Sequence, residues 1–127
     1  MEWVQGSTVW RALIFEYPQD AEALFIDRQF MVGSSILVSP VLDQGATTVY
    51  AYFPADRWYD FYTGQTVGTT TNGEFVTLNA PIDTLNIHLR GGSIVVTQLP
   101  ALSTKAARTN PYELLVALSP NVRHRHL

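Results

Sequence analysis

Short apolar runs alternate with turn residues along most of the chain. Glycine, proline and asparagine interrupt the pattern about every eight to twelve residues, a spacing typical of an all-β sandwich or barrel. The runs between them are rich in Val, Ile, Thr, Phe and Tyr, and they predict strands at 34–42, 47–53, 57–62, 74–78, 84–89, 93–97 and 112–118. Gly91-Gly92 is expected to supply the tight connection between the strands at 84–89 and 93–97. This part of the pattern predicts a mostly β fold, an antiparallel β-sandwich.

The first third of the chain has a different pattern. Residues 8–16 are almost continuously apolar around Arg11, which predicts a strand covered on both faces, as in a parallel sheet. Residues 21–30 carry the helical signal, with Asp20 as a candidate N-cap and Gly33 soon after the end. We therefore expect one buried strand and one short helix before the sandwich.

Two later segments are expected to lie outside the strands. Residues 99–110 form a predicted loop with a short helical turn, and residues 121–127 form a predicted disordered tail.

Composition restricts the classes of partner. The 127 residues suit one domain, and charged residues make up 15% with a formal net charge of −3. The eight basic residues are scattered, so we expect no nucleic-acid binding. The chain has no cysteine, which removes disulfides and zinc–thiolate sites but leaves the compartment open.

Membrane and targeting signals are absent from the pattern. The first residues lack a basic start followed by an apolar block, so no signal peptide is expected. The longest uncharged apolar stretch, 30–42, is far shorter than the about 20 residues that span a bilayer. We expect no membrane contact, and the localisation stays unknown.

Few side chains suggest nucleophilic or metal chemistry. His88 lies on a predicted strand and is expected to be a hydrogen-bonded sheet residue, and His124 and His126 lie in the tail. The serines lack the strand-turn-helix elbow of an activated nucleophile. We assign no catalytic residue, no metal site and no cofactor.

An aromatic group marks the strand at 57–62. Alternation places Trp58 and Tyr62 on one face and Tyr59 and Phe61 on the other, so at least one pair is expected to pack in the core. Planar aromatic rings also stack on sugars, which makes Trp58, Tyr59 and Tyr62 candidate sugar-stacking residues.

Several phrases, in order and with their spacing kept, resemble the region that follows the catalytic motifs in family 31 glycoside hydrolases, the maltase, sucrase-isomaltase and acid α-glucosidase group. They are GSTVWRAL (6–13), FEYP (15–18), DRQFMVG (27–33), ILVSPV (36–41), YFP (52–54), RWYD (57–60), YTG (62–64), APID (80–83), HLRGGSI (88–94) and NPYEL (110–114). Two departures are Ala12 and Val96, which stand where the family commonly has proline.

The resemblance implies a domain division. Residues 1–33 would be the remnant of the last β/α unit of a (β/α)8 barrel, 34–120 the proximal C-terminal β-sandwich, and 121–127 the tail. The family's aspartate nucleophile, in a Trp-x-Asp-Met-Asn-Glu-like motif, and its aspartate acid/base lie upstream of the matched stretch. None of them can be carried onto this chain.

The carboxylates of the chain agree with that expectation. A glycosidase needs two carboxyl groups on opposite sides of the scissile bond. Nearly all of the acidic residues lie beside turn or cap signals; the candidates are Asp20, Asp27, Asp43, Asp56, Asp60, Asp83, Glu16, Glu22 and Glu74. Glu16 is the exception, because it ends the predicted buried strand, where barrel active sites are built.

Two hypotheses remain open. The first is the C-terminal portion of an α-glucosidase-like enzyme, with a bracing role, no activity of its own and the missing upstream barrel as its partner. The second is a stand-alone β-sandwich that binds an α-linked oligosaccharide through the Trp58–Tyr62 aromatics. Alone, the chain is expected to expose the unpaired edges and apolar faces of residues 9–15, and this exposure is expected to cause self-association or aggregation.

Overall fold

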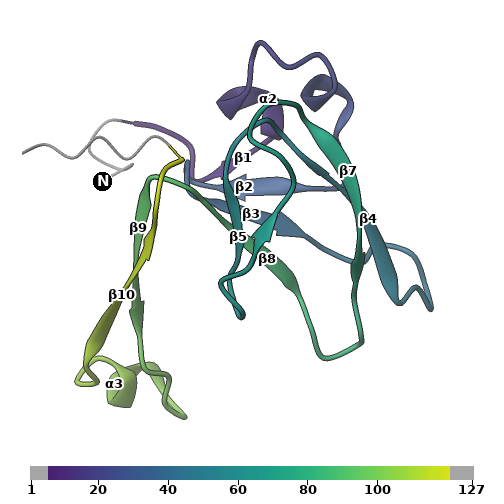
Figure 1. The fold of residues 1–127 in the computed structure, drawn as a ribbon. Helices are drawn as coiled ribbons and strands as arrows, with labels where there is room; N and C mark the ends of the chain where they lie inside the picture. The colour runs from purple at the N-terminus through teal and green to yellow at the C-terminus, as the bar shows by residue number, and fades with distance from the viewer. Residues whose placement is uncertain (1–5, 121–127) are drawn as a thin grey trace, which may run out of the picture.

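The computed structural model describes residues 6–120 as a mostly β molecule with antiparallel pairing in every sheet (Figure 1). Its strands and short helices, in chain order, are β1 Trp10–Arg11, α2 Leu13–Glu16, η1 Ala23–Phe25, β2 Phe30–Val32, β3 Ile36–Ser39, β4 Thr48–Phe53, β5 Trp58–Asp60, β6 Thr66–Val67, β7 Glu74–Asn79, β8 Asn86–Arg90, β9 Ser93–Gln98, α3 Thr104–Ala107 and β10 Tyr112–Ala117. The predicted mostly β, antiparallel fold class is confirmed.

The largest sheet has six strands in the order β1-β2-β3-β8-β5-β6. β3 and β8 form its centre, with Leu37 opposite His88, and β5 continues it, with Tyr59 opposite Leu89. The central strands are mostly buried, whereas β1 and β6 are two-residue edge strands. Short edges of this kind offer few unpaired backbone groups to another chain.

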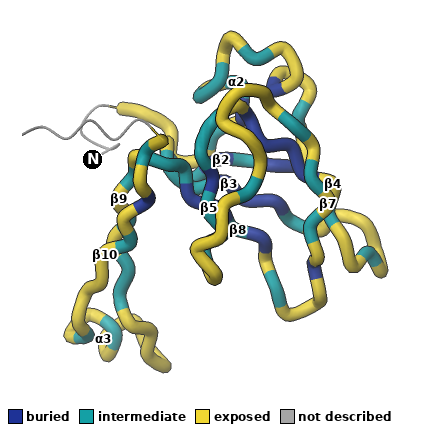
Figure 2. Tube along the Cα trace, in the orientation of Figure 1, coloured by how far each residue is buried: buried dark blue, intermediate teal, exposed yellow. Residues whose placement is uncertain are grey.

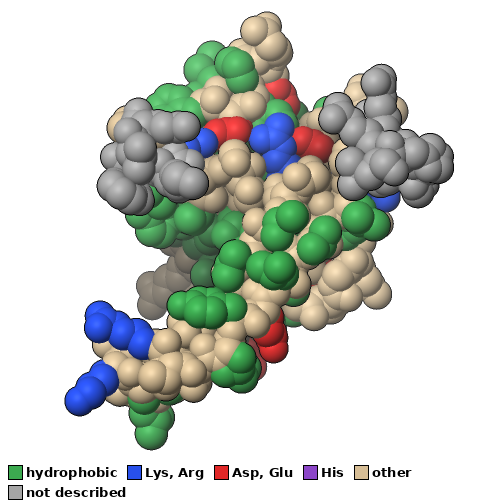
Figure 3. Space-filling model, turned by 90° about the vertical axis from the view of Figure 1, so that its left-hand side faces the viewer, with side chains coloured by type: hydrophobic (Ala, Val, Ile, Leu, Met, Phe, Trp, Pro, Cys, Tyr) green, Lys and Arg blue, Asp and Glu red, His purple; other side chains and the backbone are tan. Residues whose placement is uncertain are grey.

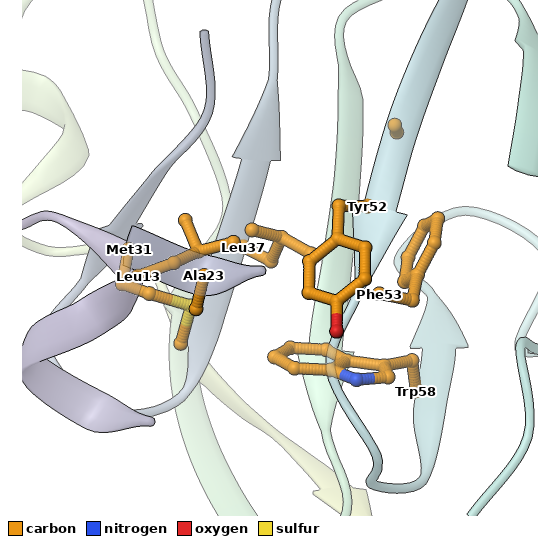
Figure 4. Close-up of a cluster of buried hydrophobic side chains, with 8 residues drawn as sticks. Leu13, Ala23, Met31, Leu37, Tyr52, Phe53 and Trp58 are labelled. Atoms are coloured by element: carbon orange, nitrogen blue, oxygen red, sulfur yellow. The ribbon is translucent and has the colours of Figure 1, made fainter. Parts of the chain in front are cut away.

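A second layer consists of β4 and β7, which pair along six residues each. Phe53 of β4 meets the large sheet, with ring centroids 6.2 Å from Trp58 and 4.8 Å from His88. Figure 4 shows Phe53 and Trp58 packed near Tyr52, within a core that also contains Leu13, Ala23, Met31 and Leu37. Burying each large apolar side chain contributes roughly 1.5–3 kcal/mol, so these contacts dominate the cohesion of the two layers.

Gln29 ties the two layers together through the backbone. Its amide oxygen accepts a hydrogen bond from Tyr52 N at 2.7 Å, and its Nε2 donates to Tyr52 O at 3.1 Å and to Ser39 Oγ at 2.9 Å. Gln29 is only 6% exposed. The side chain therefore replaces a strand neighbour for β4 at a place where the backbone would otherwise be unsatisfied.

β9 and β10 form a ribbon that projects from the sandwich and has α3 at its far end (Figure 1); we call it the arm. Figure 2 shows that most of the arm is exposed or half-buried, in contrast to the sheets of the sandwich. The view from the side of the arm shows hydrophobic side chains along it and basic side chains near its tip (Figure 3). Its exposed apolar residues include Ile94, Val96, Tyr112, Leu114 and Val116.

Gly91-Gly92 connects β8 and β9 as expected, but it does not form a hairpin turn. β9 pairs only with β10, so the two glycines mark the point where the chain leaves the sandwich. Gly92 has φ +88°, and a Cβ on Gly91 would lie 2.8 Å from the Arg57 Cβ and 2.9 Å from Leu118 O. Close backbone approach explains glycine here better than hairpin geometry does.

The expectations for the first third of the chain were wrong in detail. Residues 8–16 do not form one strand, because only Trp10–Arg11 is extended and Leu13–Glu16 is helical. A short apolar run does not distinguish a strand from a buried helical turn, and in this helix only Leu13 is buried. The expected helix at 21–30 is a single 3₁₀ turn, although Asp20 Oδ1 does accept hydrogen bonds from the first backbone N–H groups.

The remaining elements agree more closely with the sequence. The predicted strands from residue 34 onward are all present with shifted ends, and the helical turn expected within 99–110 is α3. Two-residue β6 was not predicted. The division at residue 33 stays a prediction; β2 and β3 are antiparallel neighbours across it. The tail at 121–127, with His124 and His126, lies outside the described residues.

Candidate functional site

Charged side chains converge where the end of α2 meets the ends of β5 and β8. Arg90 Nε donates to Asp56 Oδ2 at 2.8 Å, and Arg90 Nη1 donates to Glu16 Oε2 at 3.2 Å. The other Glu16 oxygen pairs with Arg11 at 2.5 Å, and the Tyr17 hydroxyl donates to Asp56 at 3.1 Å. We call these five residues the Arg90 cluster.

The Arg90 cluster contains the one carboxylate that the sequence singled out, Glu16. The guanidinium of Arg90 bonds to both Glu16 and Asp56, so it occupies the space between the two carboxylates. A glycosidase pair instead flanks open space in which the scissile bond lies. The arrangement is that of an ion-pair network, and it attaches the segment around α2 to the sandwich.

Tyr17 completes this attachment. The Arg90 guanidinium lies 4.6 Å from the centre of its ring, a cation–π contact. Burial raises the pKa of the Tyr17 hydroxyl, so it remains protonated and able to donate to Asp56. Both its ring and its hydroxyl thus contact the same cluster.

Two other acidic residues shape the backbone. Asp60 Oδ1 accepts hydrogen bonds from the N–H groups of Tyr62 and Thr63, at 2.8 and 2.9 Å. Asp20 Oδ2 accepts from the Tyr52 hydroxyl at 2.7 Å while its other oxygen caps the turn before η1. These are the turn and capping roles expected for most carboxylates of the chain.

The candidate sugar-stacking residues lie in different environments. Trp58 is 0% exposed, and its Nε1 donates to Pro54 O at 3.0 Å, so its indole has no open face for a sugar ring. Tyr59 is half-buried, and Tyr62 is 59% exposed. The hydroxyls of Tyr59 and Tyr62 donate to the backbone oxygens of Leu118 and Leu85. Trp58 is therefore not accessible for stacking on a sugar in this structure. A sugar-stacking role for Tyr59 and Tyr62 stays a prediction.

His88 differs from the hydrogen-bonded residue that the sequence predicted. It is 0% exposed, and neither ring nitrogen has a hydrogen-bond partner among the described residues. Its ring packs edge-on against Phe53, and its Nε2 lies 4.0 Å from Asp60 Oδ2. Burial lowers the pKa of His88, against a weaker opposing effect of Asp60. The sequence pattern correctly placed His88 on a strand, but it did not indicate that the two ring nitrogens would lack hydrogen-bond partners.

A separate pocket of about 360 Å³ lies between η1, the loop after β3 and the face of the β4–β7 layer. Tyr50 and Phe75 stack in it, with ring centroids 4.7 Å apart and planes 12° apart. Arg28 Nη2 donates to Asp43 Oδ2 at 2.6 Å on its rim, and Phe25 adds an exposed ring. We call it the Tyr50 pocket. Alternation along 47–52 indicated a half-exposed strand, but no sequence signal joined Arg28 and Asp43 to it.

Within residues 6–120 no three His, Asp or Glu side chains are grouped so that they could hold a metal ion. In the same part of the chain, none of the helices has the length and apolar character needed to cross a membrane.

Comparison with known proteins relates the chain to one enzyme family. Residues 6–95 match the model of the glycosyl hydrolase family 31 C-terminal domain. A probable alpha-glucosidase of Oryza sativa subsp. japonica is 50% identical over 114 residues, which is 90% of this chain and 13% of that protein. Probable maltase-glucoamylase 2 of Homo sapiens is 47% identical over 118 residues, 93% of this chain and 5% of that protein.

Solved structures show the same relationship. The Flavobacterium johnsoniae dextranase FjDex31A, complexed with glucose, superposes with a TM-score of 0.81 at 31% identity over 90% of this chain and 14% of its own. A glucosidase II alpha subunit in its Tris-bound form superposes with a TM-score of 0.84 at 26% identity, over 92% and 13% of the two chains. The chain thus spans a small fraction of the length of each of these proteins.

Proposed function

Because the chain belongs to glycosyl hydrolase family 31, whose C-terminal domain it matches, we propose that it is the C-terminal portion of an α-glucosidase-like enzyme. In this role it braces the catalytic barrel of that enzyme, and the barrel is its partner. Hydrolysis of O-glycosyl bonds belongs to the whole enzyme. The two relatives compared by sequence are a probable alpha-glucosidase and a probable maltase-glucoamylase, which supports an α-linked glucoside as the substrate.

The observation that carries the bracing role is an exposed apolar surface on the segment before the sandwich. Trp10 is 66% exposed, Phe15 65% and Leu24 62%, and α2 and η1 lie next to each other at one end of the molecule (Figure 1). Phe15 and Leu24 lie on these two neighbouring elements, and Trp10 lies on the strand directly before α2. Large apolar side chains left exposed on adjoining segments mark an interaction surface. We call these three residues the docking surface.

The Arg90 cluster gives the docking surface a fixed position. Glu16 ends α2 directly after Phe15, and Tyr17 follows, so the bonds from Arg90 and Asp56 hold the helix against the sandwich. A partner that packs on Phe15 is therefore connected mechanically to β5 and β8. Rigid support of this kind maintains catalytic geometry at a distance without a chemical step of its own.

The same cluster supports the absence of independent activity. Glu16 and Asp56 are both bonded to Arg90, so neither faces open space across a cleft from the other. The isolated chain is expected to hydrolyse neither maltose nor isomaltose.

A domain exchange tests the proposal. The corresponding segment of the rice relative is replaced by residues 6–118 of this chain, and maltose hydrolysis of the purified chimera is compared with that of the parent. The chimera should keep activity within about tenfold, and a Phe15→Asp chimera should lose most of it or fail to assemble. The matched control is Leu102→Asp, at an exposed leucine far from the docking surface.

Two results would count against the proposal. Maltose hydrolysis by the isolated 127-residue chain would require a catalytic pair of carboxylates, which Glu16 and Asp56 of the Arg90 cluster do not supply. A Phe15→Asp chimera that is as active and as stable as the unmodified chimera would show that the docking surface does not brace the barrel.

A further inference from the structure

We propose that the Tyr50 pocket is a binding site for a neutral hexose ring, such as the end unit of an α-linked gluco-oligosaccharide. The site is separate from the strand at 57–62, since its lining contains no residue of that strand. This inference rests on the proposed function only in one respect, the choice of an α-linked glucose unit as the sugar.

The pocket has a planar floor whose orientation is fixed. Phe75 stacks on one face of the Tyr50 ring, and its own position is set by Tyr52 at 5.0 Å. Tyr50 nevertheless remains 70% exposed. A tyrosine held from behind offers a flat apolar face at little entropic cost, which is what the C–H face of a sugar ring requires.

Hydrogen-bonding groups stand at the rim of that floor. Arg28 and Asp43 bond to each other at 2.6 Å, while their side chains remain 56% and 75% exposed. The guanidinium therefore keeps most of its donors free, and the carboxylate keeps lone pairs free. Neighbouring hydroxyls of a hexose can bridge such a donor–acceptor pair without breaking it.

The charges of the lining disfavour an anionic ligand. Among the described residues that line the pocket, Glu22, Asp27 and Asp43 are acidic and Arg28 is the only basic one. An anionic ligand such as a sugar phosphate would therefore meet net negative charge. A polar molecule without charge does not meet this repulsion.

The size and place of the pocket agree with one ring. Its volume of about 360 Å³ lies at the lower end of the range for small-molecule sites, about 300–1,000 Å³. It also adjoins η1, which presents Leu24 of the docking surface, and ligand sites are frequent beside domain interfaces. Affinity should be low, with a dissociation constant of the order of 1 mM.

Saturation-transfer difference NMR on the full 127-residue chain tests the site, because it observes the sugar and tolerates oligomeric protein. Maltose and isomaltose should give saturable transfer, which Tyr50→Ala and Arg28→Ala should weaken at least tenfold. Tyr112→Ala is the matched control, since it removes another exposed tyrosine, on the arm, and should leave transfer unchanged. Circular dichroism checks that each variant is folded.

Several results would overturn the inference. They are the absence of saturable transfer up to about 50 mM sugar, transfer that persists in Tyr50→Ala, loss in the control Tyr112→Ala, and tighter binding of glucose 6-phosphate than of glucose. None of these bears on the domain exchange, whose activity readout depends on Phe15. The two proposals can therefore fail separately.

Discussion

The His88 side chain should make the folded chain sensitive to mild acid. Its ring is fully buried without a hydrogen-bond partner among the described residues, and burial lowers its pKa. The unfolded chain has a histidine pKa of about 6.5, so below that pH the unfolded state binds more protons than the folded state. The free energy of unfolding is therefore unaffected by His88 titration above about pH 6.5, and it decreases as the pH falls below that value.

The size of the effect follows from one proton. Between the unfolded pKa and the lowered folded pKa, each pH unit costs about 1.4 kcal/mol. His88→Leu removes the titration and both unsatisfied nitrogens. The variant should be more stable than the wild type by roughly 1–3 kcal/mol at pH 7.5, and the difference should grow by about 1.4 kcal/mol at pH 5.5.

Urea unfolding followed by tryptophan fluorescence measures this difference at pH 5.5, 6.5 and 7.5. Both proteins carry His124→Gln and His126→Gln, so that only His88 titrates as a histidine. Parallel pH dependence in the two proteins would refute the reasoning. A wild type that gains stability in acid relative to the variant would show instead that protonated His88 pairs with Asp60, 4.0 Å away.

Three further outcomes follow from the packing. Gln29→Leu leaves the N–H and C=O of Tyr52 without their buried partner and should cost about 2–5 kcal/mol in urea unfolding; a loss under 1 kcal/mol would contradict the role of Gln29 as a link between the layers. Gly91→Ala brings a methyl group against Leu118 O and should lower the melting temperature by several degrees. Gly45→Ala is the control, because Gly45 has a positive φ but, among the described residues, no atom close enough to contact an added methyl group. The isolated chain should form concentration-dependent oligomers in sedimentation velocity, and Leu114→Lys on the arm should reduce them; a monodisperse wild type would count against this.

The sequence predicted strands well where alternation and turns agreed. At 47–53, both the apolar period and the flanking turn residues indicate a strand, and β4 occupies almost the same residues. Residues 8–16 lack any such alternation. Their apolar character is divided between Leu13, which is buried, and Trp10 and Phe15, which face outward, so composition alone could not indicate which side was covered.

The polar sites depend on contacts that lie far apart in the chain. Glu16 was noted from its place in the sequence, but its partner Arg90 is 74 residues away. Similarly, Arg28 and Asp43 meet beside Tyr50 only because the turn after η1 and the loop after β3 approach the same strand. Pairings of this kind come from topology, and a local pattern carries no information about them.

The arm leaves and rejoins the sandwich at nearly one point, since Gly92 N donates to Ala117 O at 2.7 Å. The two ends of the ribbon are therefore held side by side at the sandwich, and changing the length of the ribbon should not displace the strands of the sandwich. The tip near α3, which has no buried residue, is thus a suitable place to insert an epitope or a fluorophore. A label there would report assembly into a larger enzyme without touching the core, the docking surface or the Tyr50 pocket.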